Sequence, residues 1–319
     1  MCWPRLPGIT AARRTRISRT STCSRCRALP CLDVLAQLRG DDPDTWQLVR
    51  QRAVDDPNEY VRGNACCLLG PRKDDTGIED LLRRRIAEDP GEMARADALD
   101  ALSDNYGDDE KVWELARRLA VEDPSDGVRD TAITALCQNR SEDHATWELV
   151  FDRVTTDEHA FVREEAMRSM RHYPGDRAHA WNLFRERACD DTDASVRARA
   201  LLLLATDHGD DPATLDLIRD RAVADPSVRV RAAVLRWWAV YETGETGAEL
   251  LRGSAVTDPH PGARTVALQS LAYGWPAHPA TVPLIRERAE ADEDEEVRAE
   301  AARALAAAEA LAPLAEQLP

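Results

Sequence analysis

Apolar residues recur at intervals of three and four within short segments, and similar segments recur about every 34 residues. Residues 146–154, TWELVFDRV, and 281–289, TVPLIRERA, place their apolar side chains on one helical face and their charges on the other. This spacing is typical of amphipathic α-helices. A second helical segment, richer in alanine and leucine, follows each of these. The pattern therefore predicts two helices per repeat.

An Asp-to-Arg spacing of six residues fixes the register of the repeat. It first appears in residues 55–70, DDPNEYVRGNACCLLG, and returns at steps of 33 or 34 residues. A leucine stands eight residues before each aspartate, and a small residue stands three positions after each arginine. The pairs are Asp56 and Arg62, Asp89 and Arg95, Asp123 and Arg129, Asp157 and Arg163, Asp191 and Arg197, Asp225 and Arg231, Asp258 and Arg264, and Asp292 and Arg298.

The residues around each aspartate resemble a helix start. Aspartate is a favoured N-cap, and proline is tolerated in the first helical turn. Proline follows the aspartate at positions 57, 90, 124, 226 and 259, and glutamate stands three residues after it at 59, 92 and 295. We therefore expect the aspartate to cap the second helix of each repeat, with a capping box at those glutamates. Glycines such as Gly70, Gly107 and Gly209 are expected to cap the ends of the second helices.

The repeated arginine needs a partner, because it lies beside core positions and a buried guanidinium must be paired. Side chains six residues apart on one helix do not meet, so the aspartate of its own repeat cannot serve. We expect each arginine to reach the aspartate of a neighbouring repeat, or a turn carbonyl. The eight pairs would then form a structural ladder through the stacked repeats.

A helix pair of this size cannot bury both of its faces alone, so the repeats must stack. The predicted fold is all-α: a right-handed α-solenoid of about eight two-helix repeats of 33–34 residues. Residues 1–30 are expected to be a basic, disordered extension, and residues 313–319 a C-terminal cap. The solenoid, 31–312, comprises a half-unit at 31–43 and repeats near 44–76, 77–110, 111–144, 145–178, 179–212, 213–245, 246–279 and 280–312.

Charge is distributed unevenly along the chain. The net charge is −16, yet residues 1–31 hold seven arginines and no acid. Without those arginines, the 42 basic and 58 acidic residues become 35 against 58, a net charge near −23. Such a body repels nucleic acid, so we expect no nucleic-acid binding outside residues 1–31, the basic arm. No apolar run is long enough to span a membrane, and we expect a soluble, cytoplasmic protein.

Candidate metal and catalytic groups are sparse. Cys23, Cys26 and Cys31 offer three zinc ligands at the spacing C-x2-C-x4-C, but neither a second close pair nor a nearby histidine completes the site. None of the seven histidines lies three or four residues from another, so no helical metal pair is present. Phosphate-binding and serine-hydrolase motifs are also missing. We expect no metal, no cofactor and no catalytic residue.

The Asp–Arg register resembles the HEAT repeat, in particular the short bacterial form similar to the phycobilisome-lyase repeat. The resemblance covers residues 31–312. It implies an armadillo-like solenoid that acts as a non-enzymatic protein-interaction scaffold or adaptor. The alternative that it leaves open is a HEAT-like enzyme or accessory lyase acting on a protein substrate. In the deoxyhypusine hydroxylase type, His-Glu pairs hold iron, but no histidine of this chain is followed by glutamate.

A solenoid binds partners on its concave face, which the second helices line. Positions five residues after each repeated arginine are expected there, and they vary: Cys67, Asp100, Thr134, Arg168, Leu202, Arg236, Gln269 and Arg303. Ordinary surface positions vary too. Arginine and aromatic residues are favoured interface anchors. Our hypothesis is a groove for an acidic or extended peptide within residues 165–305, with candidate partner-binding residues Arg168, Arg236, Trp237, Gln269 and Arg303.

Overall fold

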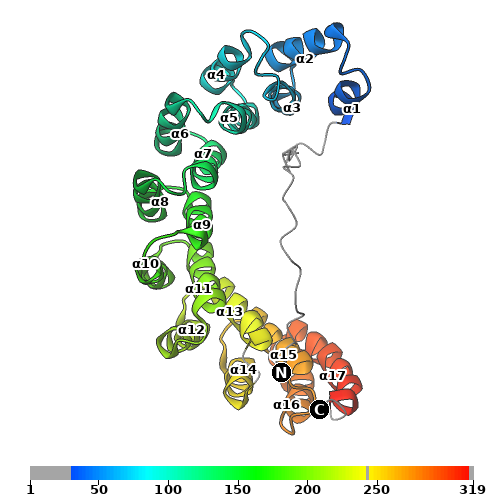
Figure 1. Cartoon of the computed structure of the whole chain (residues 1–319). Helices are drawn as coiled ribbons and strands as arrows, with labels where there is room; N and C mark the ends of the chain where they lie inside the picture. The colour runs from blue at the N-terminus through cyan, green and yellow to red at the C-terminus, as the bar shows by residue number, and fades with distance from the viewer. Residues whose placement is uncertain (1–29, 242–243, 316–319) are drawn as a thin grey trace, which may run out of the picture. The chain divides into compact units, whose positions relative to one another are not determined.

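The computed structural model describes residues 30–241 and 244–315, and within these ranges the chain consists of helices joined by turns (Figure 1). The described residues form seventeen α-helices, α1 to α17, and one short 3-10 helix, Met170–His172. The predicted all-α class with two helices per repeat is confirmed. The handedness of the solenoid stays a prediction.

The helices alternate between the first and the second position of each repeat. A half-repeat, α1 (Pro30–Leu38), precedes them. The first helices are α2 (Pro43–Asp55), α4 (Ile78–Glu88), α6 (Glu110–Glu122), α8 (His144–Thr156), α10 (Arg177–Asp190), α12 (Pro212–Ala224), α14 (Glu245–Thr257) and α16 (Thr281–Ala291). The second helices are α3 (Glu59–Leu69), α5 (Glu92–Tyr106), α7 (Asp126–Asn139), α9 (Ala160–Ser169), α11 (Ala194–His208), α13 (Val228–Tyr241), α15 (Pro261–Gly274) and α17 (Glu295–Ala315).

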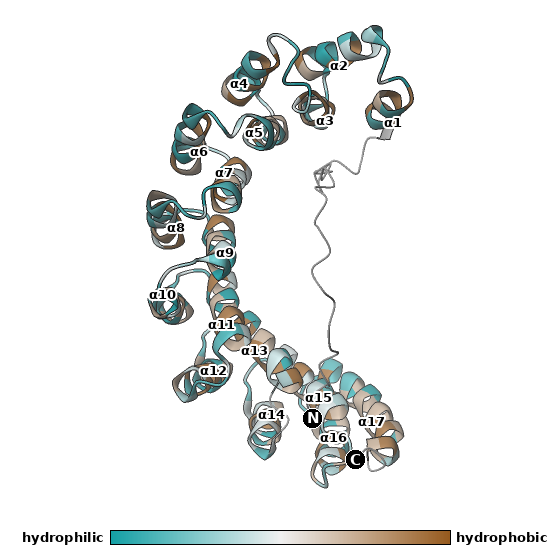
Figure 2. Ribbon diagram, in the orientation of Figure 1, coloured by the Kyte–Doolittle hydropathy of each residue, from teal (hydrophilic) through white to brown (hydrophobic). Residues whose placement is uncertain are grey.

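The described residues divide into two compact units, unit 1 up to Ala116 and unit 2 from Arg117 onward, and the division falls within α6. In unit 2, consecutive second helices from α7 to α17 pack against one another and form the inner layer. The first helices, α8 to α16, form the outer layer of the same unit (Figure 1). Individual helices show a hydrophilic and a hydrophobic side, as the repeat pattern predicts (Figure 2).

Small residues in the second helices allow close packing of the layers. The alanine three residues after the repeated arginine is fully buried in seven repeats, and Val234 takes its place in α13. In unit 1, a Cβ atom added at Gly63 of α3 would lie 2.3 Å from a carboxylate oxygen of Asp97 in α5. Large side chains such as Leu136, Met170 and Trp238 fill the space seven residues after the arginine.

The repeated aspartate does not cap the second helix, which corrects the sequence expectation. Asp56 is the C-cap of α2, and α3 begins three residues later with Asn58 as its N-cap. The Asp56 carboxylate instead accepts the backbone N–H of Asn58 at 3.0 Å. An aspartate that bonds the amide two residues on forms an Asx-turn, which explains why the residue lies between the helices. The same bond recurs at all eight repeats.

The predicted capping boxes are also wrong, because they depended on that assignment. Glu59 is the first residue of α3, and its carboxylate accepts the backbone N–H of Met93 in the next repeat at 3.1 Å. Gly70, Gly107 and Gly209 do stand at C-caps, but with right-handed helical dihedral angles. Among the described residues, Gly77 before α4 is the glycine with a positive φ, 81°.

The two ends of the array differ from their predicted boundaries. α17 continues without a break to Ala315, with Pro313 inside it, so residues 313–315 belong to the last helix and not to a separate cap. The predicted extension 1–30 lies outside the described residues apart from Pro30, as do residues 316–319. In the part of the chain that the structure describes, no helix has the length and apolarity needed to cross a membrane.

Candidate partner-binding site

The repeated arginines and aspartates form a buried ladder between neighbouring repeats. Arg163 on α9 donates from Nε to one carboxylate oxygen of Asp191 at 2.9 Å and from Nη2 to the other at 2.7 Å. Both residues are buried. This two-pronged geometry is the strongest form of a charged hydrogen bond. The same arrangement joins Arg62 to Asp89, Arg129 to Asp157, Arg197 to Asp225, Arg231 to Asp258, and Arg264 to Asp292.

Each arginine also bonds the turn of its own repeat. Nη1 of Arg163 donates to the backbone carbonyl of Asp157, six residues earlier, at 2.8 Å. All eight arginines make this bond, including Arg95 and Arg298. One guanidinium therefore fixes the turn of its own repeat, and in the six pairs named above it also holds the carboxylate of the next repeat.

The ladder shifts the ionisation of its aspartates. Burial acts to raise the pKa of Asp89 and Asp225, but hydrogen bonds from the arginine and from the backbone N–H two residues on outweigh it. The pKa of each carboxyl therefore lies below its ordinary value. The same balance lowers the pKa of Asp258 and Asp292. These four aspartates are ionised and buried at neutral pH, so they stabilise the stack and offer no contact to a partner.

Three predicted partner-binding residues have partners within the chain. Arg168 on α9 forms an ion pair with Glu165 of the same helix. Gln269 on α15 donates to the Glu300 carboxylate on α17 at 3.2 Å, and Arg303 pairs with that same glutamate. The side chains of Arg168 and Arg303 remain exposed, but their charges are already compensated.

The other two predicted residues lie on α13. Arg236 is exposed and makes no ion pair with any described residue. Trp237 is half-buried and stacks on Tyr241, with ring centroids 4.9 Å apart and planes inclined by 20°. The neighbouring Trp238 is fully buried, as its core register predicts.

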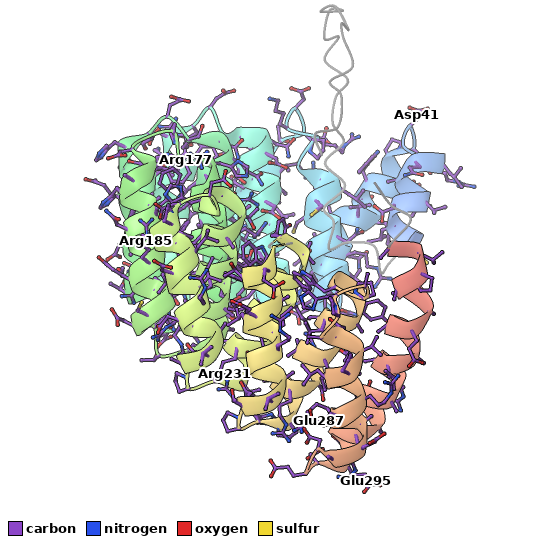
Figure 3. The ribbon with its side chains drawn as sticks, turned by 90° about the horizontal axis from the view of Figure 1, so that it is seen from below. Asp41, Arg177, Arg185, Arg231, Glu287 and Glu295 are labelled. Carbon is purple, nitrogen blue, oxygen red and sulfur yellow. The ribbon has the colours of Figure 1, made fainter. Side chains whose placement is uncertain are left out.

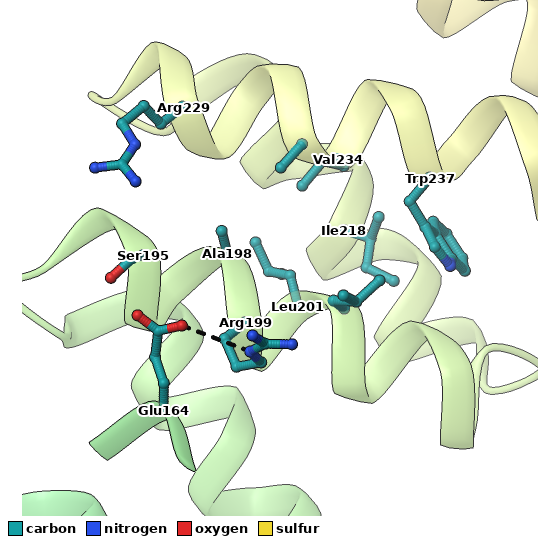
Figure 4. Close-up of a pocket in the computed structure, with 11 residues that line it drawn as sticks. Glu164, Ser195, Ala198, Arg199, Leu201, Ile218, Arg229, Val234 and Trp237 are labelled. Carbon is teal, nitrogen blue, oxygen red and sulfur yellow. Dashed lines mark ion pairs between the residues drawn. The ribbon is translucent and has the colours of Figure 1, made fainter. Parts of the chain in front are cut away.

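Trp237 closes one end of a pocket between α11 and α13 (Figure 4). The pocket has a volume of about 300 Å³. Its walls are mostly apolar, and they come from the inner helices α11 and α13 and from α12 behind them. The apolar lining residues are Ala198, Leu201, Leu202, Ile218, Ala233, Val234 and Trp237.

Polar side chains gather at the opposite end of this pocket. Glu164, Ser195, Arg199 and Arg229 line it there (Figure 4). Nε of Arg199 lies 3.6 Å from the Glu164 carboxylate, a loose ion pair. Arg229 is exposed and has no carboxylate within 4 Å among the described residues. The arrangement combines an apolar cleft with one uncompensated guanidinium at its mouth.

Sequence reasoning missed Arg229 and Ala233. Both lie on the exposed face of α13. Ala233, Arg236, Trp237 and Val240 follow Arg229 on this face by four, seven, eight and eleven residues. Such spacings bring side chains to one helical face. A usable signal was present: α13, VRVRAAVLRWWAVY, carries three arginines and no acid in a chain of net charge −16.

Two cysteines, the buried Cys66 and the half-buried Cys137, have thiols that stay protonated. Burial raises the pKa of the Cys66 thiol to about 12, and likewise that of the Cys137 thiol to about 12. A thiol that stays protonated is a poor nucleophile and a poor metal ligand. Cys31 is exposed on α1, whereas Cys23 and Cys26 lie outside the described residues. Within the described ranges, no three His, Cys, Asp or Glu side chains come together as a metal site.

Comparison with known proteins identifies the repeats. Residues 46–137 match the family model for HEAT repeats. Residues 46–137 therefore carry HEAT repeats, and the resemblance inferred from the Asp–Arg register is confirmed there. The likeness to the phycobilisome-lyase form stays a prediction.

A solved structure supports the fold across most of the chain. The X-ray structure of YibA from E. coli superposes with a TM-score of 0.50 at 17% sequence identity, covering 86% of this chain and 95% of that protein. At this identity the likeness concerns the fold, an α-solenoid of stacked helix pairs. None of the curated proteins matches the sequence.

Proposed function

We propose that the chain is a non-enzymatic scaffold that binds a segment of another protein along the inner layer of unit 2. Stacked repeats present a continuous helical surface, and the inner helices of such arrays are used for binding. The ladder occupies the buried side of these helices and leaves their opposite side available. The proposal includes a reducing, cytoplasmic setting, with which the free thiols of Cys66 and Cys137 are compatible.

One observation carries this proposal: the exposed face of α13. Arg229 and Arg236 stand there without ion pairs among the described residues, beside the exposed Val240 and the half-buried Trp237. Most other arginines of the inner layer are compensated, as Arg168 and Arg303 are. Uncompensated arginines next to exposed aromatic and aliphatic side chains are favoured features of protein interfaces.

The test is affinity capture from the native host, followed by mass spectrometry. We expect the unaltered chain to retain at least one protein that the double variant Arg229→Glu, Arg236→Glu loses. The matched control is Arg118→Glu with Arg177→Glu, which changes the net charge equally at exposed arginines on α6 and α10. Figure 3 shows Arg177 at the outer edge of unit 2, away from α13.

An identical set of proteins captured by the parent and by the α13 variant would refute the scaffold proposal as stated. Return of the captured protein in a covalently altered form would instead favour the alternative, an accessory lyase acting on a protein substrate.

A further inference from the structure

We propose that the pocket between α11 and α13 is an anchor site for one apolar side chain of an acidic peptide segment, with a carboxylate of that segment held by Arg229. The inference rests on the proposed function and names the chemistry of the partner. It concerns a single pocket, whereas the scaffold proposal concerns the whole inner layer.

The size and lining of the pocket define the anchor. A volume of about 300 Å³ is at the lower end of the range for small-molecule sites. It suits one or two side chains better than a bulky cofactor. Leu202 is 41% exposed at the rim, and Ala233 opposite it is also exposed. An aliphatic or aromatic side chain entering here would cover apolar surface that the chain itself leaves in contact with water.

The polar end defines the charge beside the anchor. Arg229 affects one nearby acid, Asp193: hydrogen bonds from Ser195 lower the pKa of that carboxyl most, and the charges of Arg163 and Arg229 lower it further. Asp193 already accepts both the N–H and the O–H of Ser195, at 2.8 and 2.7 Å. The guanidinium of Arg229 makes no hydrogen bond with a described residue, so its donors are available to an incoming carboxylate, with which arginine forms a two-pronged bond.

The charge of the surroundings favours an acidic partner at this helix. Arg236 lies seven residues from Arg229 on the same face and adds a second uncompensated positive charge. Glu164 faces the pocket as well, but Arg199 lies 3.6 Å from it and offsets its charge. Three arginines, Arg199, Arg229 and Arg236, thus stand against the two acids Glu164 and Asp193, a local excess of positive charge in a chain that is strongly acidic as a whole.

The basic arm of this chain is a poor occupant by the same reasoning. Residues 1–31 hold seven arginines and no acid, so Arg229 and Arg236 would repel them. Nucleic acid fits less well, because its phosphates would use Arg229 and Arg236 but leave the apolar cleft unfilled, and the chain carries a net charge of −16.

The experiment is a selection from a phage-displayed random peptide library against the full chain. We expect the enriched peptides to share one large apolar residue within a few positions of Asp or Glu. The most enriched peptide is then synthesised with a fluorescent label, and its dissociation constant is measured by fluorescence anisotropy. Raising the salt concentration from about 50 to about 500 mM should weaken binding, since Arg229 acts through charge.

Three variants locate the binding site. Ala233→Trp fills the cleft from an exposed position and should weaken binding by about ten-fold or more, the effect expected when a central anchor pocket is lost. Arg229→Gln should weaken it by about five-fold, and Arg177→Gln, the charge-matched control, by less than about two-fold. Circular dichroism verifies folding, and Leu202→Ser replaces Ala233→Trp if that variant does not fold.

Several outcomes would overturn the inference. They are a library that yields no enriched peptide, peptides whose affinity Ala233→Trp leaves unchanged, and peptides rich in Lys or Arg. A dimer in analytical ultracentrifugation that Ala233→Trp converts to a monomer would assign the pocket to a second copy of the chain instead.

The two proposals fail separately. If the Arg229→Glu, Arg236→Glu variant loses a host protein that Ala233→Trp retains, the scaffold proposal holds and the anchor-pocket proposal is refuted. If peptides bind the pocket but capture of every host protein is independent of α13, the anchor-pocket proposal is supported and the scaffold proposal is refuted.

Discussion

At the scale of single residues, the repeated arginine contributes more than a charge pair. Arg163 uses Nε and Nη2 on the carboxylate of Asp191 and Nη1 on the carbonyl of Asp157. Lysine could not replace it, because a single ammonium cannot reach these three acceptors in fixed directions. The pairing of arginine with the next aspartate could be expected from the sequence. The Asx-turn of that aspartate could not, because a short acidic side chain satisfies N-caps and turns equally well.

Replacing a ladder arginine should destabilise the fold strongly. Arg163→Leu leaves the buried Asp191 carboxylate with one distant arginine, Arg187, at 3.7 Å. We expect the free energy of unfolding, measured by urea titration, to fall by about 3 kcal/mol. Adding Asp191→Asn removes the stranded charge but keeps the turn acceptor, and should recover part of the loss.

Arg298 provides the matched control for this prediction. It stands in the last repeat, is half-buried, and donates to the carbonyls of Asp292 and Glu293. Arg298→Leu should cost only about 1 kcal/mol. Equal urea midpoints for Arg163→Leu and the parent would show that the ladder contributes nothing to stability.

At the scale of helices, a tryptophan ties the start of several first helices to the turn before them. The indole N–H of Trp147 on α8 donates to the carbonyl of Ser141 at 2.7 Å. Trp46 and Trp113 bond Gly40 and Gly107 in the same way. Helix existence and register were predictable from hydrophobic spacing, whereas these bonds depend on how the turn folds back over the ring.

Trp181 occupies the same register in α10 but stacks on His208, with ring centroids 4.1 Å apart. This difference gives an internal control for the indole bond. Trp147→Phe should lower the free energy of unfolding by about 1 kcal/mol more than Trp181→Phe, since only the former loses a partly buried indole hydrogen bond. Thermal and urea unfolding of the two variants measure the difference, and a larger loss in Trp181→Phe would contradict it.

At the scale of the whole molecule, stability is divided among many equivalent interfaces. Within each unit, neighbouring repeats are joined by the same ladder bonds, such as Arg62 to Asp89 in unit 1 and Arg163 to Asp191 in unit 2. Global stability then depends on the ionisation of several similar aspartates at once. Neither the division into two units within α6 nor the loss of a separate C-terminal cap was visible in the repeat pattern, because both depend on packing.

Acid should therefore weaken the fold cooperatively. The pKa values of Asp89, Asp225, Asp258 and Asp292 are lower in the folded chain than the ordinary value of about 3.9. A lowered folded pKa adds stability that is complete above the unfolded pKa and is lost as the pH falls through the folded pKa. We expect urea midpoints to stay level from about pH 8 to pH 5 and to fall steeply below about pH 4. A midpoint that is unchanged at about pH 3 would contradict this account.

The sequence by itself determined the repeat, its two helices, the buried small residues and the pairing of arginine with aspartate. These features follow from periodic apolar spacing and from the requirement that a buried charge be paired. Only the tertiary structure decided which surface residues are available. Arg168 and Arg303 meet glutamates three residues away on their own helices. Arg229 and Arg236 have no such neighbour and lie beside a cleft that α11, α12 and α13 form together. A cleft between helices depends on how side chains from separate repeats fill the space between them, which no single repeat specifies.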